Sequence, residues 1–177
     1  ENKMMNKKLL AAVVAASAVL TGCGSDSDGA VSQTYLEAAV DANPRTVIST
    51  ADDNCTEFGG TLDDTVCLLP SRITATGGSF SKDVTYYLNS VTFLGYGDKE
   101  LETEADVTYL KNNPVSLTIP AGTTIEGAAR SAFVVTRGAE LNANGTEAEP
   151  IIFESADNNL TGSSEWGGLV IQGFGIT

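Results

Sequence analysis

A pair of apolar residues that recurs at a fixed interval constrains the fold of this chain most strongly. The first members of the pairs are Val115, Phe133, Ile151 and Leu169, and the second members are Leu117, Val135, Phe153 and Ile171. One residue separates the two members, as on one face of a β-strand. A chain that returns its side chains to one side at a fixed interval winds as a coil of parallel strands, with coils about 4.8 Å apart. The sequence therefore predicts an all-β, single-stranded parallel β-helix with rungs of about 18 residues from about residue 115. An antiparallel sandwich with fortuitous spacing is the alternative.

Further strands and turns fit between these pairs. Apolar and polar residues alternate over 139–143, and Thr123 and Ile125 are expected to take the equivalent place one turn earlier. Glycines between the strand candidates supply the turns. A left-handed coil with a six-residue ladder also has rungs of about 18 residues. It would point Glu147 and Glu165 inward, in register with the apolar pairs, and is therefore disfavoured.

Four segments of this region resemble a known family: residues 117–125, 133–146, 150–155 and 166–173. The series ends in Trp-Gly-Gly-Leu-Val-Ile-Gln-Gly and resembles bacterial cell-surface lipoproteins built on a right-handed parallel β-helix of the pectate-lyase-like superfold. Residues 87–93 resemble the opening segment of that family. The resemblance covers about residues 83–177 and implies a right-handed coil. Its motifs are structural, so it implies no activity.

The N-terminal residues are typical of an export signal. Lys7 and Lys8 precede an apolar or small-residue run at 9–20, which is too short for a membrane-spanning helix of about 20 residues. Its length suits the apolar region of a signal peptide. The tetrapeptide that ends at Cys23, Leu-Thr-Gly-Cys, resembles a bacterial lipobox, in which a peptidase cleaves before the cysteine. We therefore predict that residues 1–22 are a lipoprotein signal peptide. An ordinary secretory signal with a chance cysteine is the alternative.

Cleavage before Cys23 predicts a lipid anchor. The sulfur of Cys23 would take up a diacylglyceryl group, and more than one acyl chain holds a protein stably on a membrane. Residues 23–31 are rich in Gly, Ser and Asp and are typical of a flexible tether. In Gram-negative bacteria, an Asp directly after the lipidated cysteine tends to retain a lipoprotein in the inner membrane. This chain has Gly24 at that position. We therefore expect an exported protein on the outer membrane of a Gram-negative bacterium, facing the cell surface or the periplasm.

Residues 32–114 are expected to form an N-terminal cap region in front of the β-helix. Residues 32–42 have helical character, with Ser32 as the N-cap. Two β-like segments predict short strands: Arg72 to Thr76, and Val84 to Leu94, which is rich in Tyr, Val, Thr and Phe.

Cys55 and Cys67 remain once Cys23 is assigned to the anchor. Because an exported chain faces an oxidising compartment, we predict a disulfide between them. A metal or redox site at these cysteines is disfavoured, since the chain has neither histidine nor a CxxC motif.

Other residues invite functional interpretations that we weigh against simpler ones. The acidic run at 98–106 could supply oxygens to Ca²⁺, but it lacks the spaced Asp, Asn and Gly of calcium loops, so a solvated loop is favoured. Trp166 could stack on a sugar, although packing at a turn is favoured. Arg130 and Arg137 could act like the catalytic arginine of pectate-lyase-like enzymes, but neither has an evident set of Asp and Lys partners.

Composition narrows the function. The absence of histidine excludes Ser-His-Asp and Cys-His catalysis within this chain, and a net charge of −13 argues against nucleic acid as a partner. We expect a non-enzymatic, lipid-anchored surface protein that uses a β-helix as a scaffold for binding or adhesion, without cofactor or metal.

Two alternatives to this scaffold role remain open. One is a polysaccharide-binding or polysaccharide-degrading protein whose active rungs lie outside this fragment, and the other is a surface assembly component that stacks through an open end. Residues 115–177 form the expected β-helix, and because no capping segment follows its last strand, we expect further rungs beyond Thr177.

Overall fold

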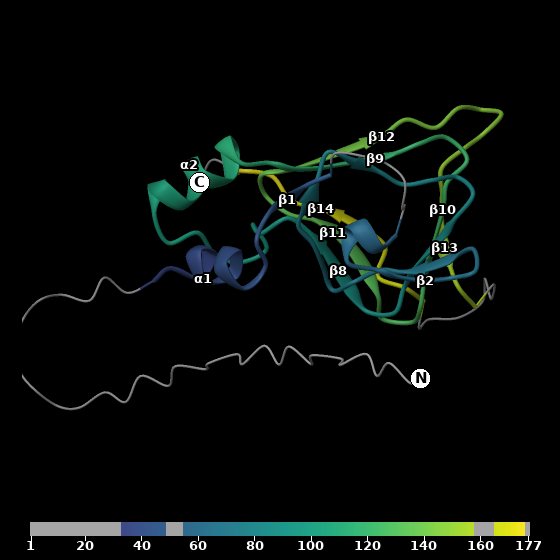
Figure 1. The fold of residues 1–177 in the computed structure, drawn as a ribbon, viewed down its shortest axis with the longest axis horizontal. Helices are drawn as coiled ribbons and strands as arrows, with labels where there is room; N and C mark the ends of the chain where they lie inside the picture. Colours follow the sequence, from purple (N-terminus) through teal and green to yellow (C-terminus); the bar gives the residue numbers. More distant parts are fainter. Residues whose placement is uncertain (1–32, 49–54, 158–164, 176–177) are drawn as a thin grey trace, which may run out of the picture. The chain divides into compact units, whose positions relative to one another are not determined.

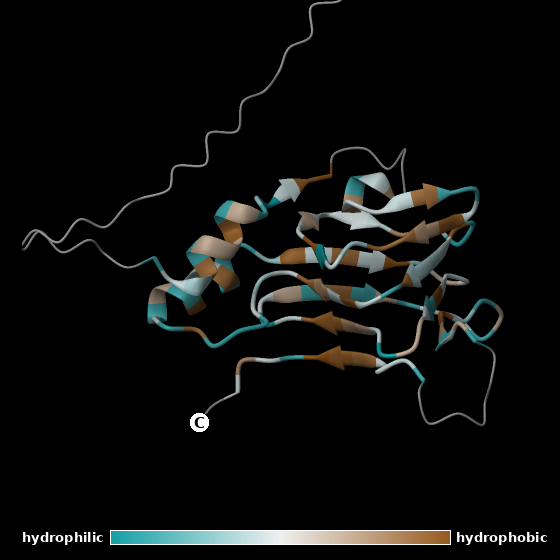
Figure 2. Ribbon diagram, turned by 90° about the horizontal axis from the view of Figure 1, so that it is seen from below, coloured by the Kyte–Doolittle hydropathy of each residue, from teal (hydrophilic) through white to brown (hydrophobic). Residues whose placement is uncertain are grey.

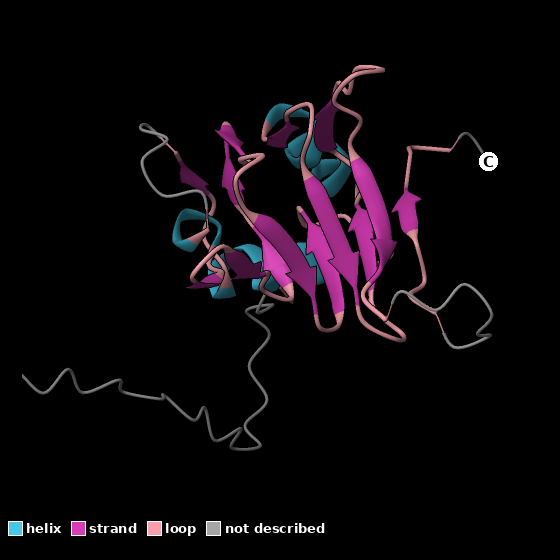
Figure 3. Cartoon of the chain, turned by 90° about the vertical axis from the view of Figure 1, so that its right-hand side faces the viewer, coloured by secondary structure: helices cyan, strands magenta, loops and turns pink. Residues whose placement is uncertain are grey.

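The computed structural model describes residues 33–48, 55–157 and 165–175. These residues belong to one compact unit, Gln33–Thr177. Its strands wind around a common core on three faces (Figure 1), and strands of one face lie side by side (Figure 3). Almost all neighbouring strands are parallel, so the predicted parallel coil is confirmed.

Each face is a small sheet made from successive coils. Face 1 has the order β13-β10-β7-β3-β2, face 2 has the order β14-β11-β8-β4, and face 3 has the order β12-β9-β6. The strands of face 1 are β2 (Thr61–Asp63), β3 (Val66–Leu68), β7 (Thr85–Leu88), β10 (Thr124–Gly127) and β13 (Ile152–Ser155). Those of face 2 are β4 (Arg72–Ile73), β8 (Val91–Leu94), β11 (Ala132–Val135) and β14 (Leu169–Ile171). Those of face 3 are β6 (Gly78–Ser79), β9 (Val115–Ile119) and β12 (Ala139–Ala143).

The rung length expected from the apolar spacing is wrong. The register pairs Phe133 with Leu169 and Val135 with Ile171, so one full coil here is twice the interval between successive apolar pairs. Leu117 instead lies beside Leu141 on face 3, after a shorter coil. One interval between apolar pairs therefore carries the chain from one face to another and not once around. The connections between faces differ in length, so the coils contain different numbers of residues. The regular spacing of the apolar pairs therefore does not give the length of a coil.

Two further details of the predicted register are also wrong. Phe153 does not stack on Val135, because it lies on face 1 beside Ile125. The segment around Ile125 is not the equivalent of 139–143 one turn earlier, because β10 belongs to face 1 and β12 to face 3. Buried residues do alternate with more exposed ones along β9 and β10, as predicted. Which face a strand joins depends on the length and direction of the turns between strands, and the pattern of apolar residues does not give these.

Apolar side chains of successive coils stack on one another and form columns along each face. On face 2 the column is Ile73, Leu94, Val135 and Ile171, with one residue from each coil. Their exposed fractions are 0, 0, 3 and 69% in that order. Burying a side chain of this size contributes about 1.5 to 3 kcal/mol. The first three coils therefore hold the core, and the last described coil has nothing above it among the described residues.

The first coil is covered by local structure. β2 pairs antiparallel with β3, at the outer edge of face 1. The predicted disulfide is confirmed, because Cys55 and Cys67 are bonded, with Cα atoms 5.6 Å apart. Gly60 leaves room for this bond, since a Cβ there would lie 2.8 and 2.9 Å from the two sulfur atoms. The rings of Phe58, Phe80 and Tyr86 pack together in the core. The remaining short elements are η1 (Thr56–Phe58) and the two-strand pair of β1 (Thr46–Val47) and β5 (Ala75–Thr76).

Two helices lie together beside the coil (Figure 1). The predicted helix at 32–42 is α1 (Tyr35–Ala42), with Thr34 as its N-cap in place of the predicted Ser32, which lies outside the described residues. The acidic run was expected to be a solvated loop, but its last three residues begin α2 (Glu104–Asn112). Thr103 is the N-cap of α2 and forms a capping box with Asp106. This capping box favours a helix start even though the segment is acidic.

Candidate functional site: a cavity between two helices

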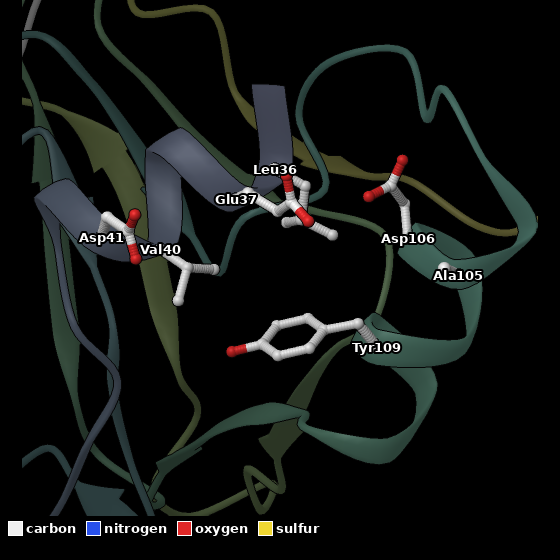
Figure 4. A pocket seen from close by; sticks show the side chains of 7 residues that line it. All are labelled: Leu36, Glu37, Val40, Asp41, Ala105, Asp106 and Tyr109. Atoms are coloured by element: carbon white, nitrogen blue, oxygen red, sulfur yellow. The ribbon is translucent and has the colours of Figure 1, made fainter. Parts of the chain in front are cut away.

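A cavity of about 260 Å³ lies between α1 and α2 (Figure 4). One wall comes from one face of α1, and the opposite wall comes from the first turns of α2. The lining residues are Leu36, Glu37, Val40, Asp41, Ala105, Asp106 and Tyr109.

The two helix N-termini are joined by hydrogen bonds. Thr34, the N-cap of α1, donates its hydroxyl to Oδ1 of Asp106 at 3.1 Å. The backbone N–H of Tyr35 donates to Oε1 of Glu102 at 3.0 Å. Each helix also has its own capping box, in which side chain and backbone satisfy one another across the first turn. One end of the cavity is therefore held by two helix starts that share partners.

Asp106 is the buried centre of this junction. Its Oδ2 accepts hydrogen bonds from the backbone N–H groups of Glu102 and Thr103, at 3.1 and 2.9 Å. Burial raises the pKa of Asp106, but the hydrogen bonds from Thr103, Thr34 and Glu102 outweigh burial and hold that pKa below its usual value. Asp106 is thus a charged structural group whose oxygens are engaged.

The remaining lining residues give the cavity an apolar interior with an acidic edge. Leu36 is buried, and Val40 and the ring of Tyr109 are half-buried. Glu37 and Asp41 are exposed, one turn apart on α1. Among the residues that the structure describes, no lysine or arginine lines this cavity.

A buried ion pair fastens the loop that leads into α2. Arg72 on β4 contacts both oxygens of Asp98, at 2.8 and 3.1 Å, and the side chains are 14 and 4% exposed. The hydroxyl of Tyr35 donates to Asp98 at 3.3 Å. Burial and the Asp98 carboxylate raise the pKa of Tyr35, and Arg72 offsets part of that rise. The partners saturate one another, which suits a structural role.

The other residues weighed from the sequence do not converge on a site. Arg137 donates hydrogen bonds to the carbonyl groups of Gly97 and Lys99. It thereby holds the loop that leads into α2. Trp166 packs against Phe153, with ring centroids 6.2 Å apart. Within the described ranges, no group of three or more Asp, Glu, Cys and His side chains is placed to hold a metal ion. Cys23 lies outside the described residues, so its predicted lipidation stays a prediction.

Sequence reasoning missed the cavity because it missed α2. A signal was present: Thr103 and Asp106 have the three-residue spacing of a capping box, and the apolar residues Val107 and Leu110 follow it. The pairing of this helix with α1, which comes much earlier in the chain, has no local signature.

A second surface of interest is the last described coil, which we call the open end: β12, β13 and β14. Figure 2 shows β14, next to the C-terminal end, as an apolar strand. Large apolar side chains are exposed on β13, on β14 and just after it: Ile152, Leu169, Val170, Ile171 and Phe174. An uncovered strand edge with apolar side chains is a ready surface for another strand.

Comparison with known proteins agrees with the fold. Residues 98–177 match the family model described as the pectate-lyase like beta helix domain. A search of the curated proteins and a search of the solved structures each found no match. The similarity and the parallel sheets together identify a β-helix fold. The description refers to an architecture, and architecture alone carries no activity. Among the described helices, none has the length and apolar character needed to cross a membrane.

Proposed function

We propose that this protein is a lipid-anchored, non-enzymatic surface protein whose right-handed β-helix is a scaffold for binding. In this proposal Cys23 carries the lipid, residues 1–22 are removed, and the domain stands on the outer membrane of a Gram-negative bacterium. The Cys55–Cys67 disulfide carries the proposal, because it suits an oxidising compartment outside the cytoplasm. The lipobox-like tetrapeptide that ends at Cys23 supplies the anchor.

Metabolic labelling tests the anchor. The full chain is expressed in a Gram-negative host that is fed radiolabelled palmitate, and the labelled protein is followed on a gel. We expect label on the wild-type chain, none on Cys23→Ser, and undiminished label on Cys55→Ser. Label that persists in Cys23→Ser contradicts the proposal. Protease treatment of intact cells then separates the cell surface from the periplasmic face.

Assembly through the open end is a second candidate function, favoured by the apolar side chains exposed there. In this candidate, further coils or another polypeptide cover β13 and β14. Light scattering on the chain from residue 23 onward, carrying Cys23→Ser, measures its mass. A concentration-dependent increase that Ile171→Asp abolishes supports stacking between copies, and a monomer at all concentrations argues against it.

A further inference from the structure

We propose that the cavity between α1 and α2 binds a lysine side chain presented by another polypeptide. The proposal goes beyond the scaffold role and does not depend on the lipid anchor. It rests on the apolar walls of the cavity, on the one-sided placement of its carboxylates, and on a tyrosine ring that faces α1.

The walls suit the aliphatic stem of lysine. Leu36 and Val40 come from α1, and Ala105 and Tyr109 come from α2 (Figure 4). Lysine buries its methylene groups along such surfaces and keeps its ammonium group in a polar environment. The ring of Tyr109 extends from α2 toward α1 (Figure 4), and an aromatic face attracts a nearby ammonium group. A volume of about 260 Å³ accommodates one such side chain.

The carboxylates select a cation and fix its position. Glu37 and Asp41 lie one turn apart on α1, where like charges destabilise a helix. One oxygen of Glu37 accepts from the N–H of Thr34, and one oxygen of Asp41 accepts from the amide of Gln33. The second oxygen of each forms no hydrogen bond with any described residue. An ammonium group placed between them would receive two acceptors and relieve the repulsion.

The distribution of charge favours lysine over a free diamine. Glu37 and Asp41 are both on α1, and the third carboxylate, Asp106, is already engaged by three hydrogen bonds. The cavity therefore offers one position for one ammonium group. A diamine would leave its second ammonium group against apolar walls or in solvent, whereas lysine has only one.

Nuclear magnetic resonance titration tests the proposal. The chain from residue 23 onward, carrying Cys23→Ser, is titrated at low salt with Nα-acetyl-lysine methylamide. The matched probe is Nα-acetyl-norleucine methylamide, which has a similar stem without charge, and 1,5-diaminopentane tests the diamine. We expect the lysine probe to shift the amide signals of α1 and α2 and to bind at least tenfold more tightly than norleucine. Equal binding of lysine and norleucine overturns the charge argument, and tighter binding of the diamine overturns the lysine assignment.

Two variants locate the contact. Asp41→Asn keeps the shape of an exposed side chain, and we expect it to weaken lysine binding at least fivefold. Tyr109→Leu keeps the wall apolar but removes the ring, and we expect a smaller loss. Asp63→Asn, an exposed acid on β2, is the matched control and should bind normally. Glu37 is left unchanged because it also caps α1. If Asp41→Asn and Tyr109→Leu both bind like Asp63→Asn, the proposal is wrong.

Discussion

The two ends of the face 2 column contain the same residue type in opposite surroundings. Ile73 on the first coil is fully buried, whereas Ile171 on the last described coil is mostly exposed. By register, both belong to the same column. Ile73 belongs to a core cluster that also contains Phe58 and the disulfide cysteines Cys55 and Cys67. Burial in a β-helix is thus decided by what lies above and below a side chain, more than by the side chain itself.

The largest expected effect comes from the middle of the column. Leu94 is packed between Ile73 and Val135, so Leu94→Ala opens a cavity with apolar walls above and below. We expect the free energy of unfolding to fall by about 2 to 5 kcal/mol, measured by urea denaturation followed by far-ultraviolet circular dichroism. A loss below about 1 kcal/mol would contradict the difference drawn between covered and open coils.

The disulfide gives the next largest effect. The bond joins cysteines with a sequence separation of 12 at the covered end. Replacing Cys55 and Cys67 together by Ser should lower the free energy of unfolding by about 3 kcal/mol on the chain-entropy model. Urea denaturation measures the loss, with Cys23→Ser as the control that leaves the bond intact. If the double variant is as stable as this control, the covered end does not owe its stability to the cross-link.

A smaller effect on the free energy of unfolding, which depends on pH, is expected at the buried carboxylate of Asp106. Its pKa in the folded state lies below the ordinary value, so the stability it contributes is present above that value and is lost as pH falls through the folded-state pKa. Between pH 6 and pH 3, wild type should lose more stability than Asp106→Asn. Glu154→Gln, at an exposed position on β13, is the control and should behave as wild type. Identical pH profiles for wild type and Asp106→Asn would show that the helix junction does not depend on this charge.

The smallest effect is expected at the open end. Ile171→Ala removes a side chain that is 69% exposed, so the free energy of unfolding should change by less than about 1 kcal/mol. The same urea experiment used for Leu94→Ala measures it. A loss as large as that of Leu94→Ala would mean that something covers the last coil in solution.

The sequence was sufficient for features that are local or that repeat. The Tyr, Val, Thr and Phe content of Val84 to Leu94 predicted strands where β7 and β8 lie, and the two cysteines of an exported chain predicted the Cys55–Cys67 bond. The length of a coil was not predictable from the apolar spacing, because the connections between strands differ in length. For example, α2 lies between β8 and β9 and lengthens one corner. This corner also depends on Gly138, where a Cβ would lie 2.8 Å from that of Leu110.

The cavity could not be predicted for a related reason. Its two walls are helices that are far apart in the chain, and one of the hydrogen bonds that join them links Thr34 to Asp106. Each of these residues has a local capping role that explains its presence. Nothing in either segment alone indicates that the two helix starts share a hydrogen bond.

The stacking of Trp166 on Phe153 has a practical consequence. The chain contains one tryptophan, and it lies beside the last coil, whereas the disulfide and the stacked ring of Tyr86 belong to the earlier coils. Indole fluorescence therefore reports on one end of the solenoid alone. Local unfolding of the terminal coil could be followed by tryptophan fluorescence, without any introduced label, while the other coils stay folded.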